Sequence, residues 1–223
     1  MSEKMIRFSD RRMSMDTSMQ DKIVERLRRQ GQGKVFTPKD FLDLGSRESV
    51  DQALSRLAKA ETVQRLGRGL YCYPKINKRL GIIIPPDVDE IASALARQTG
   101  SRITPSGAMA ANRLGLSTQV PAKPVYLTDG RSRKVRIGNF LIVVKHVAPK
   151  ELPVGNQISA TVLQALRYLG KEAIDSTVIN RIRKALLPKY RSKLLLDSKY
   201  TTDWIADAVR KIAGDQVKAI NHG

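Results

Sequence analysis

Arg68 lies between Gly67 and Gly69, and short stretches of β-strand composition stand on both sides of this triplet. Residues 62–66 precede it, and residues 70–73 follow it. Because glycine adopts the positive φ angles of a tight turn at little cost, the pattern predicts a β-hairpin. The hairpin presents one long cation at its tip, so the neighbouring residues must form a small unit with a basic projection.

Three helical patterns come before this hairpin. The first runs from Ser18 to Gly31, the second from Thr37 to Gly45 over about two turns, and the third begins after Ser46. A serine or threonine stands at each start as an N-cap, and glycine ends the first two. Three helices followed by a hairpin with a basic tip predict a winged helix-turn-helix, whose last helix enters the major groove of DNA.

The residues after Pro74 predict a second domain. Residues 75–79 are interpreted as a short basic connector, where few contacts should cross between the domains. Beyond it, apolar periodicity predicts helices that begin at Asp87 or Asp89, at Ser106, near Ala160, near Thr177 and at Thr202. Strands are predicted at 125–127, 134–137 and 140–147, with Gly138 and Asn139 as the turn between the last two.

These patterns divide the chain into three parts. Residues 1–16 show little apolar periodicity and are interpreted as a flexible arm. Residues 17–76 are interpreted as the winged helix-turn-helix DNA-binding domain, and residues 77–223 as a mixed α+β domain with a small antiparallel sheet. The predicted fold class is therefore α+β.

The charge of the chain points to a polyanionic partner. Lys and Arg number 40 against 21 Asp and Glu, a formal net charge of +19. A surface of this sign attracts nucleic acid. The apolar stretches at 82–84 and 140–144 are far shorter than the roughly 20 residues that span a bilayer, and no signal peptide pattern is present. We therefore expect a cytoplasmic protein without a membrane partner.

Residue types that build metal and redox sites are scarce. Cys72 is the single cysteine, and the two histidines are His146 and His222. This count excludes an internal disulfide and a zinc site rich in cysteine or histidine. Cys72 stands in an aromatic strand pattern, where we expect a small buried side chain. We expect no metal, no cofactor and no catalytic residue.

Exposed polar residues of the third helix and of the hairpin are the candidates for DNA contact. Arginine and glutamine make bidentate contacts with guanine and adenine edges, and an arginine at a hairpin tip suits a phosphate or the minor groove. The alternative is a solvated helix face. The candidate residues are Lys34, Thr37, Ser46, Arg47, Ser49, Gln52, Ser55, Arg56, Arg65, Arg68 and Lys75.

The second domain is the more basic of the two. Residues 77–223 hold 24 Lys and Arg against 11 acids, whereas residues 17–76 hold 12 against 7. This surface can add phosphate contacts, bind RNA, face an acidic partner or simply be solvated. The cations cluster at Arg131, Arg133, Lys134 and Arg136, and at Arg181, Arg183, Lys184, Lys189, Arg191 and Lys193.

Three sequence segments resemble the AbiEi-type antitoxin family. The segment RLGRGLYCYP at 65–74 resembles the end of that family's N-terminal domain. The segment TPSGAMAANRLGLS at 104–117 is similar to the helix that opens its second domain, and PVYLTDG at 124–130 stands where a strand of that domain is expected. The order of these segments carries the resemblance, which covers roughly residues 18–150.

The resemblance implies a type IV antitoxin with a role in phage defence. It implies a transcriptional autorepressor that binds operator repeats near its own promoter, as a monomer or a dimer on duplex DNA. It also implies a second domain that antagonises a nucleotidyltransferase toxin encoded beside it.

Two alternatives remain from the residues themselves. One is a basic nucleic-acid-binding regulator without a toxin partner. The other is a metal-dependent nuclease that uses Asp129 and Lys145 on adjacent strands. The acids at 87–90 follow two prolines at a helix start, where capping accounts for them, and Gly45-Ser46 lacks the nearby aspartates of a nucleotidyltransferase. We therefore expect no enzyme.

Overall fold

The computed structural model describes residues 18–138, 140–153 and 155–214. The predicted arm at 1–16, Asn139 of the predicted turn, and His222 lie outside this part of the chain. The described residues form a mixed α+β structure. Its N-terminal elements are, in order, α1 (Met19–Gln30), β1 (Val35–Phe36), η1 (Pro38–Phe41), α2 (Arg47–Lys59), β2 (Gln64–Gly67) and β3 (Leu70–Cys72).

Helices α1 and α2 confirm two of the predicted helices. The Ser18 hydroxyl accepts a hydrogen bond from the Asp21 amide at 3.2 Å, and Gly31 ends α1. The third predicted helix begins after Ser46, as expected, and is α2. The apolar faces of α1 and α2 meet in one buried cluster that also contains Phe36, Phe41 and Tyr71.

The second predicted helix is wrong in length. Instead of about two turns, η1 is a short 3-10 helix that spans Pro38–Phe41. The Asp40 carboxylate accepts a hydrogen bond from the Thr37 amide at 2.8 Å, and the same carboxylate pairs with Arg97 from a distant helix. These contacts stabilise η1 as a tight turn. A helix of only two turns, as predicted, is not stable by itself, and its length is therefore decided by such tertiary contacts.

Strands β1, β2 and β3 form an antiparallel sheet in the order β1-β3-β2, and β1 was not predicted. Gly67 pairs with Leu70, so the hairpin turn consists of Arg68 and Gly69 alone. Only Gly69 of the two predicted turn glycines has a positive φ, at 63°, because Gly67 is the last residue of β2.

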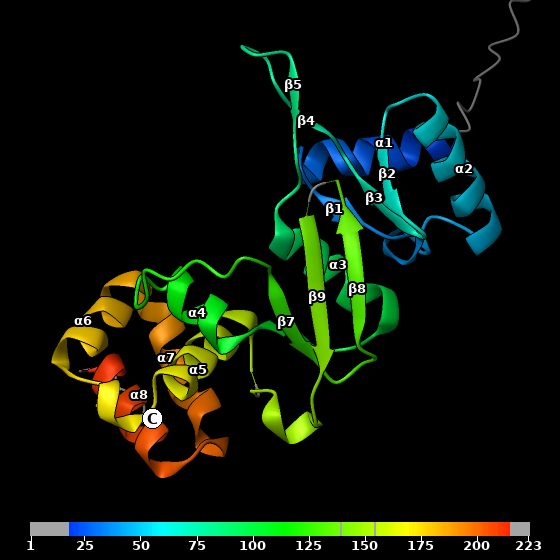
Figure 1. Cartoon of the computed structure of the whole chain (residues 1–223). Coiled ribbons are helices and arrows are strands. Elements are labelled where there is room, and N and C mark those ends of the chain that lie inside the picture. The colour runs from blue at the N-terminus through cyan, green and yellow to red at the C-terminus, as the bar shows by residue number, and fades with distance from the viewer. Residues whose placement is uncertain (1–17, 139, 154, 215–223) are drawn as a thin grey trace, which may run out of the picture.

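The predicted connector at 75–79 is wrong, because these residues begin a second hairpin. Strand β4 (Lys75–Asn77) pairs antiparallel with β5 (Ile82–Ile84) as a separate two-stranded sheet. The β-branched isoleucines of 82–84 favour a strand, and Asn77 closes the turn between the strands. Figure 1 shows this hairpin projecting beyond its neighbours.

The next residues build a four-stranded sheet and two helices. The elements are α3 (Val88–Thr99), β6 (Ile103–Pro105), α4 (Gly107–Arg113), β7 (Val125–Thr128), β8 (Arg133–Ile137) and β9 (Phe140–His146). The strand order is β6-β7-β9-β8. Two of the three strand pairs are antiparallel, and β7 and β9 run parallel. Strand β6 was not predicted.

The remaining helices form a separate layer beside this sheet (Figure 1). They are α5 (Gln157–Leu169), α6 (Ser176–Ala185), α7 (Pro188–Asp197) and α8 (Asp203–Ala213), with short 3-10 turns η2 (Pro149–Glu151), η3 (Lys171–Ala173) and η4 (Ser198–Tyr200). Helices α5, α6 and α8 confirm the predicted ones. Helix α7 was not predicted, because it buries only Leu194 and Asp197 and so has little apolar periodicity.

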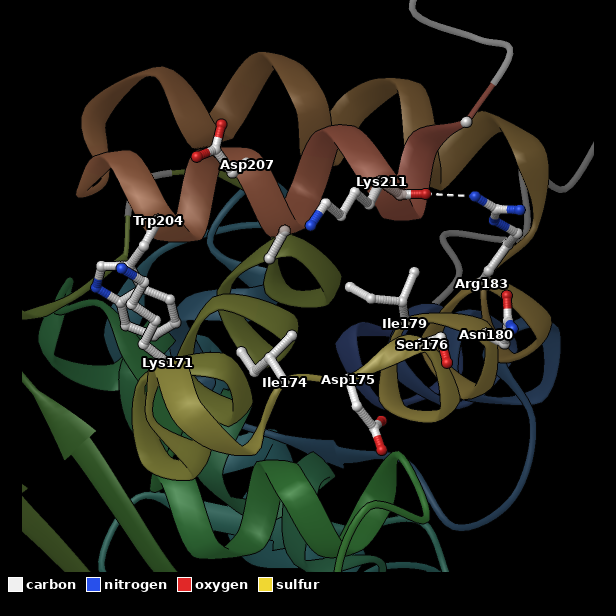
Figure 2. A pocket seen from close by; sticks show the side chains of 12 residues that line it. Lys171, Ile174, Asp175, Ser176, Ile179, Asn180, Arg183, Trp204, Asp207 and Lys211 are labelled. Atoms are coloured by element: carbon white, nitrogen blue, oxygen red, sulfur yellow. Dashed lines mark hydrogen bonds between the residues drawn. The ribbon is translucent and has the colours of Figure 1, made fainter.

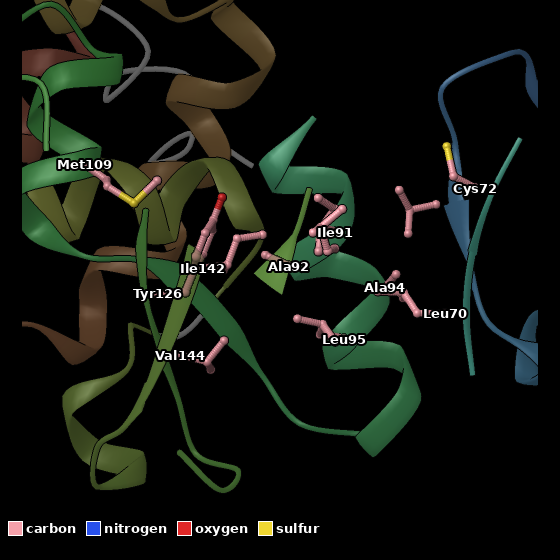
Figure 3. Packing of buried hydrophobic residues seen from close by; sticks show 12 residues of the cluster. Leu70, Cys72, Ile91, Ala92, Ala94, Leu95, Met109, Tyr126, Ile142 and Val144 are labelled. Atoms are coloured by element: carbon pink, nitrogen blue, oxygen red, sulfur yellow. The ribbon is translucent and has the colours of Figure 1, made fainter. Parts of the chain in front are cut away.

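One apolar core connects the N-terminal sheet with the four-stranded sheet (Figure 3). Leu70 and Cys72 of β3 lie on the Ala94 side of α3, and the cluster continues past Leu95 to Tyr126 and Val144 (Figure 3). Helix α3 therefore lies between the two sheets, and the core crosses the domain boundary predicted at residues 76 and 77. No helix in the described residues is long and apolar enough to span a membrane.

Candidate nucleic-acid interface

The N-terminal turns of α2 form an exposed polar surface. The Ser46 hydroxyl caps the helix by accepting the Ser49 amide hydrogen at 3.2 Å. Ser49 in turn donates its hydroxyl hydrogen to the Ser46 carbonyl at 2.9 Å, so both serines serve the cap. The opposite face of α2 is fully buried, which fixes the orientation of the exposed one. Helix N-terminal residues held in this way can approach base edges.

Four of the predicted reading residues of α2 are on its solvent-exposed side. They are Arg47, Gln52, Ser55 and Arg56, all of which are solvent exposed. The Arg47 guanidinium pairs with Asp51 at 2.8 Å. Both side chains of this ion pair are about half exposed, and such surface pairs contribute only about 0–1 kcal/mol, so Arg47 can exchange Asp51 for another acceptor.

The tip of the β2–β3 hairpin is held by α3. The Gln98 side-chain amide donates a hydrogen bond to the Arg68 carbonyl at 3.0 Å. A Cβ at Gly69 would lie 2.9 Å from the same amide nitrogen, so this glycine permits the close approach. The Arg68 and Arg65 side chains are exposed, and neither forms an ion pair with a described residue. Sequence reasoning did not find Gln98, which lies thirty residues from the hairpin.

Two predicted residues lie together but apart from α2. Lys34 pairs with Glu90 of α3 at 2.6 Å, and Lys75 lines the same hollow of about 360 Å³. No α2 residue lines this hollow, whose other walls include Asp87 and the two prolines before it. The Lys34 charge is therefore partly neutralised within the fold.

The prediction that Thr37 contacts DNA is wrong. Its exposed fraction is 0%, and its hydroxyl donates to the Asp40 carboxylate at 3.3 Å. Its role is to cap η1, and it offers no surface to DNA in this structure.

The acids at the start of α3 all have structural partners. Asp87 is the N-cap and accepts the Asp89 amide hydrogen at 2.7 Å. Asp89 pairs with Arg113 at 2.5 Å and accepts the hydroxyl hydrogen of Tyr126 at 2.5 Å. Burial and the Asp89 carboxylate raise the pKa of Tyr126 well above its usual range. No group of three or more potential metal ligands occurs among the described residues.

Asp129, the carboxylate of the alternative nuclease hypothesis, has a structural partner. Both oxygens of Asp129 accept hydrogen bonds from Arg102, one from its amide at 2.8 Å and one from its Nε at 2.9 Å. The hydrogen bond from the Arg102 side chain holds the pKa of Asp129 below its usual value. Asp129 therefore links β7 to the residue before β6.

Within residues 77–223, only some of the basic side chains in the predicted clusters are exposed without a partner among the described residues. On β8, Lys134 and Arg136 are exposed, whereas Arg133 turns inward and donates to the Leu95 carbonyl at 2.7 Å. Burial lowers the pKa of Arg133. Of the later cluster, several cations have partners: Arg181 and Arg191 donate to backbone carbonyls, and Lys193 pairs with Asp197. Lys184 and Lys189 are exposed without an ion pair to a described residue.

A groove of about 550 Å³ lies between α6 and α8 in the helical layer (Figure 2). Trp204 and Ile179 supply apolar walls, and both signs of charge line it. Arg183 at its edge donates to the Ile212 carbonyl at 3.3 Å and to the Lys211 carbonyl, which caps the end of α8. Because its charges are mixed, the groove shows no preference for a polyanion.

Cys72 lies in the core, as predicted. Its exposed fraction is 2%, and burial raises the pKa of its thiol to about 11. A thiol that stays protonated near neutral pH is a poor nucleophile.

The comparison with known families extends over most of the chain. Residues 22–195 match a family model described as a family of unknown function (DUF6088). No curated protein matches the chain. The matched residues include α2, both hairpins, the four-stranded sheet and the first helices of the helical layer.

Proposed function

The chain belongs to the DUF6088 family, and we propose that it binds duplex DNA sequence-specifically through a winged helix-turn-helix formed by its N-terminal elements. In this proposal η1 and α2 are the two helices of the motif, and the β2–β3 hairpin is the wing. The observation that carries it is the exposed N-terminal face of α2, polar and capped, on a helix whose other face is buried. Such a helix can read bases while the core fixes its orientation.

The charge distribution supports the same partner. The net charge of +19 favours association with a polyanion, and Arg56, Arg65 and Arg68 are exposed on α2 and the wing without ion pairs to described residues. Phosphate contacts from such cations fix the register of a protein on DNA, whereas base contacts give specificity. Arg47 and Gln52 are the residues that we assign to bases.

On the resemblance to AbiEi-type antitoxins, we propose further that the DNA is the operator of the chain's own promoter. The chain then acts in the cytoplasm as an autorepressor and antagonises a nucleotidyltransferase toxin encoded nearby. A regulator without a toxin partner is the alternative. The discriminating experiment is coexpression with the neighbouring nucleotidyltransferase, in which growth is restored by an antitoxin and not by a simple regulator.

The DNA-binding proposal is tested with the full chain and a library of random duplexes. Sequences enriched by binding define a preferred site, on which Arg47→Ala and Gln52→Ala are compared with the wild type. We expect a loss of about 1–3 kcal/mol on the preferred site and much less on random duplex.

Arg210 provides the matched control. It is as exposed as Arg47 and pairs with Asp207 on its own helix, but it lies on α8. Arg210→Ala should therefore leave both affinities unchanged. Equal losses on preferred and random duplexes for the α2 variants would show that α2 does not read bases.

A further inference from the structure

The β4–β5 hairpin combines exposed apolar residues with free cations. Ile76, Ile82 and Ile83 are about half exposed, and Leu80 in the turn is 63% exposed. A two-stranded hairpin by itself is only marginally stable in water. We therefore expect another molecule to cover these apolar side chains. Their exposure makes this hairpin a candidate contact surface.

The charged residues of the β4–β5 hairpin are all basic. Lys75, Lys78 and Arg79 lie in the hairpin, and residues 75–86 contain no acid. None of the three cations forms an ion pair with a described residue. A second copy of the chain would bring the same cations to the interface and would be repelled, whereas a polyanion complements them.

The turn of the hairpin is built by its own hydrogen bonds. The Asn77 side-chain oxygen accepts the amide hydrogens of Arg79 and Leu80 at 3.0 and 3.2 Å. The Asn77 carbonyl accepts the Gly81 amide hydrogen at 2.8 Å. Because the backbone of the turn is satisfied internally, the side chains at positions 78–80 are held in place at little ordering cost, and none of them has a hydrogen bond or ion pair to another described residue.

The base of the hairpin is anchored to the N-terminal unit. Tyr73 exchanges backbone hydrogen bonds with Gly33 and Lys34 at 2.7 and 2.9 Å, which extends the pairing of β1 and β3 to the start of β4. On the other strand, Ile83 lines a groove of about 440 Å³ together with Leu66 and Ile137. The hairpin therefore starts just after a residue that is paired with the N-terminal unit, and it projects beyond its neighbours (Figure 1).

We propose that the β4–β5 hairpin is a second DNA-contacting arm, in which Lys78 and Arg79 contact phosphates and Leu80 inserts at a base step from the minor groove. Apolar side chains that enter the minor groove unstack a step and bend the duplex, and neighbouring cations hold the backbone on both sides. The inference rests on the proposed DNA binding and adds a contact that α2 does not make.

The test uses the full chain and an end-labelled duplex of about 30 base pairs, three helical turns, that contains the selected site. Affinity is measured against salt concentration, and bending is measured by energy transfer between the duplex ends. Lys78→Ala/Arg79→Ala should lower the salt slope by about two units, since each phosphate contact contributes about 0.9. Leu80→Ala should abolish the bend and leave the salt slope unchanged.

Two exposed residues outside the hairpin serve as controls. Lys199→Ala removes an exposed cation and Val120→Ala an apolar side chain that is 78% exposed. Both should behave as the wild type. If the wild type binds no duplex, the proposed function and the arm fail together. If the wild type binds and the hairpin variants match these controls, the arm alone is refuted.

The molecular mass in solution shows whether a second copy of the chain, instead of DNA, binds the hairpin. Light scattering on each variant without DNA measures whether the hairpin joins two copies of the chain. A wild-type dimer that Leu80→Ala converts to a monomer would overturn the arm in favour of self-association. A mass that is the same in wild type and variants, together with the loss of bending, supports it.

Discussion

The side-chain amide of Gln98 donates a hydrogen bond to the Arg68 carbonyl over 3.0 Å, and this contact joins α3 to the turn of the β2–β3 hairpin. The same amide lies 3.4 Å from the Gly69 carbonyl. The turn is thus fixed by a helix that lies beyond the domain boundary predicted at residues 76 and 77. The position of the Arg68 side chain depends on that helix.

Removal of this contact should loosen the hairpin turn. We expect Gln98→Ala to lower the free energy of unfolding by about 1–2 kcal/mol, because it removes the hydrogen bond to the Arg68 carbonyl, for which the usual net value is about 0.5–1.5 kcal/mol, and two longer ones at 3.4 Å that involve the Gly69 carbonyl and the Arg133 guanidinium. Chemical denaturation measures the change. Gln32→Ala is the control, because Gln32 is exposed and has no hydrogen bond to a described residue. Equal stability of the two variants would contradict a holding role for Gln98.

Arg68 should act on DNA through phosphate. Arg68→Ala is expected to weaken binding to preferred and random duplexes alike and to reduce the salt slope by about one unit. Titrations at several salt concentrations measure both effects, with Lys199→Ala as the control. An unchanged slope would remove Arg68 from the phosphate contacts.

Burial of Cys72 predicts a loss of stability in alkali. The thiol has a pKa of about 11 in the folded chain and about 9 when unfolded, so between these values only the unfolded chain releases the proton. Stability is then full below about pH 9 and falls as the pH rises to about 11, by about 2–3 kcal/mol.

Cys72→Ala isolates this contribution from other groups that titrate in alkali. The difference in unfolding free energy between wild type and variant should shrink by that amount over the same interval. A constant difference would show that the thiol does not carry the predicted shift.

Gly107 should not tolerate a side chain. A Cβ there would lie 2.4 Å from the Tyr168 Cβ and 3.1 Å from the Gln164 carbonyl oxygen, where α4 crosses α5. Overpacking costs about 1–3 kcal/mol, while alanine gains up to about 1 kcal/mol in helix propensity, so Gly107→Ala should be destabilising. Thermal unfolding measures this loss. Gly67→Ala, whose Cβ would meet nothing within 4 Å, should stay within about 0.5 kcal/mol of the wild type.

The shared core predicts that the two halves do not fold independently. A fragment of residues 80–223 lacks Val35, Leu70 and Cys72, which cover α3 in the full chain. We expect a lower melting temperature than for the full chain and binding of a dye that detects exposed apolar surface. A cooperative transition at the temperature of the full chain would contradict this expectation.

Local signals in the sequence were sufficient for much of this fold. Ser46 and the apolar spacing after it predict α2, and Thr202 with Trp204 predicts α8 at its observed bounds. The β2–β3 hairpin followed from Gly69 and the strand patterns beside it. Each of these elements is determined by capping, periodicity or turn geometry within a few residues.

The features that were missed depend on distant contacts. The short η1 is fixed by Arg97, which lies in a helix more than fifty residues later. The polar residues at 75–79 suggested a connector, because the β-branched strand that pairs with them follows only after the turn. Nothing in the sequence indicated the contact between Gln98 and Arg68, because a glutamine near a helix end is common. Only the folded chain brings these two residues together.

Helix α3 contacts three elements of the N-terminal unit at once. Gln98 binds the turn of the β2–β3 hairpin, Arg97 pairs with Asp40 of η1, and Glu90 pairs with Lys34 before β1. Its other side packs in the core of the four-stranded sheet. Helix α3 therefore joins the N-terminal unit to the sheet, so the DNA binding proposed for α2 would incur little entropic cost of domain docking. Under that proposal, a molecule that binds the sheet and displaces α3 would change the affinity for DNA, and by thermodynamic reciprocity DNA would change the affinity for that molecule.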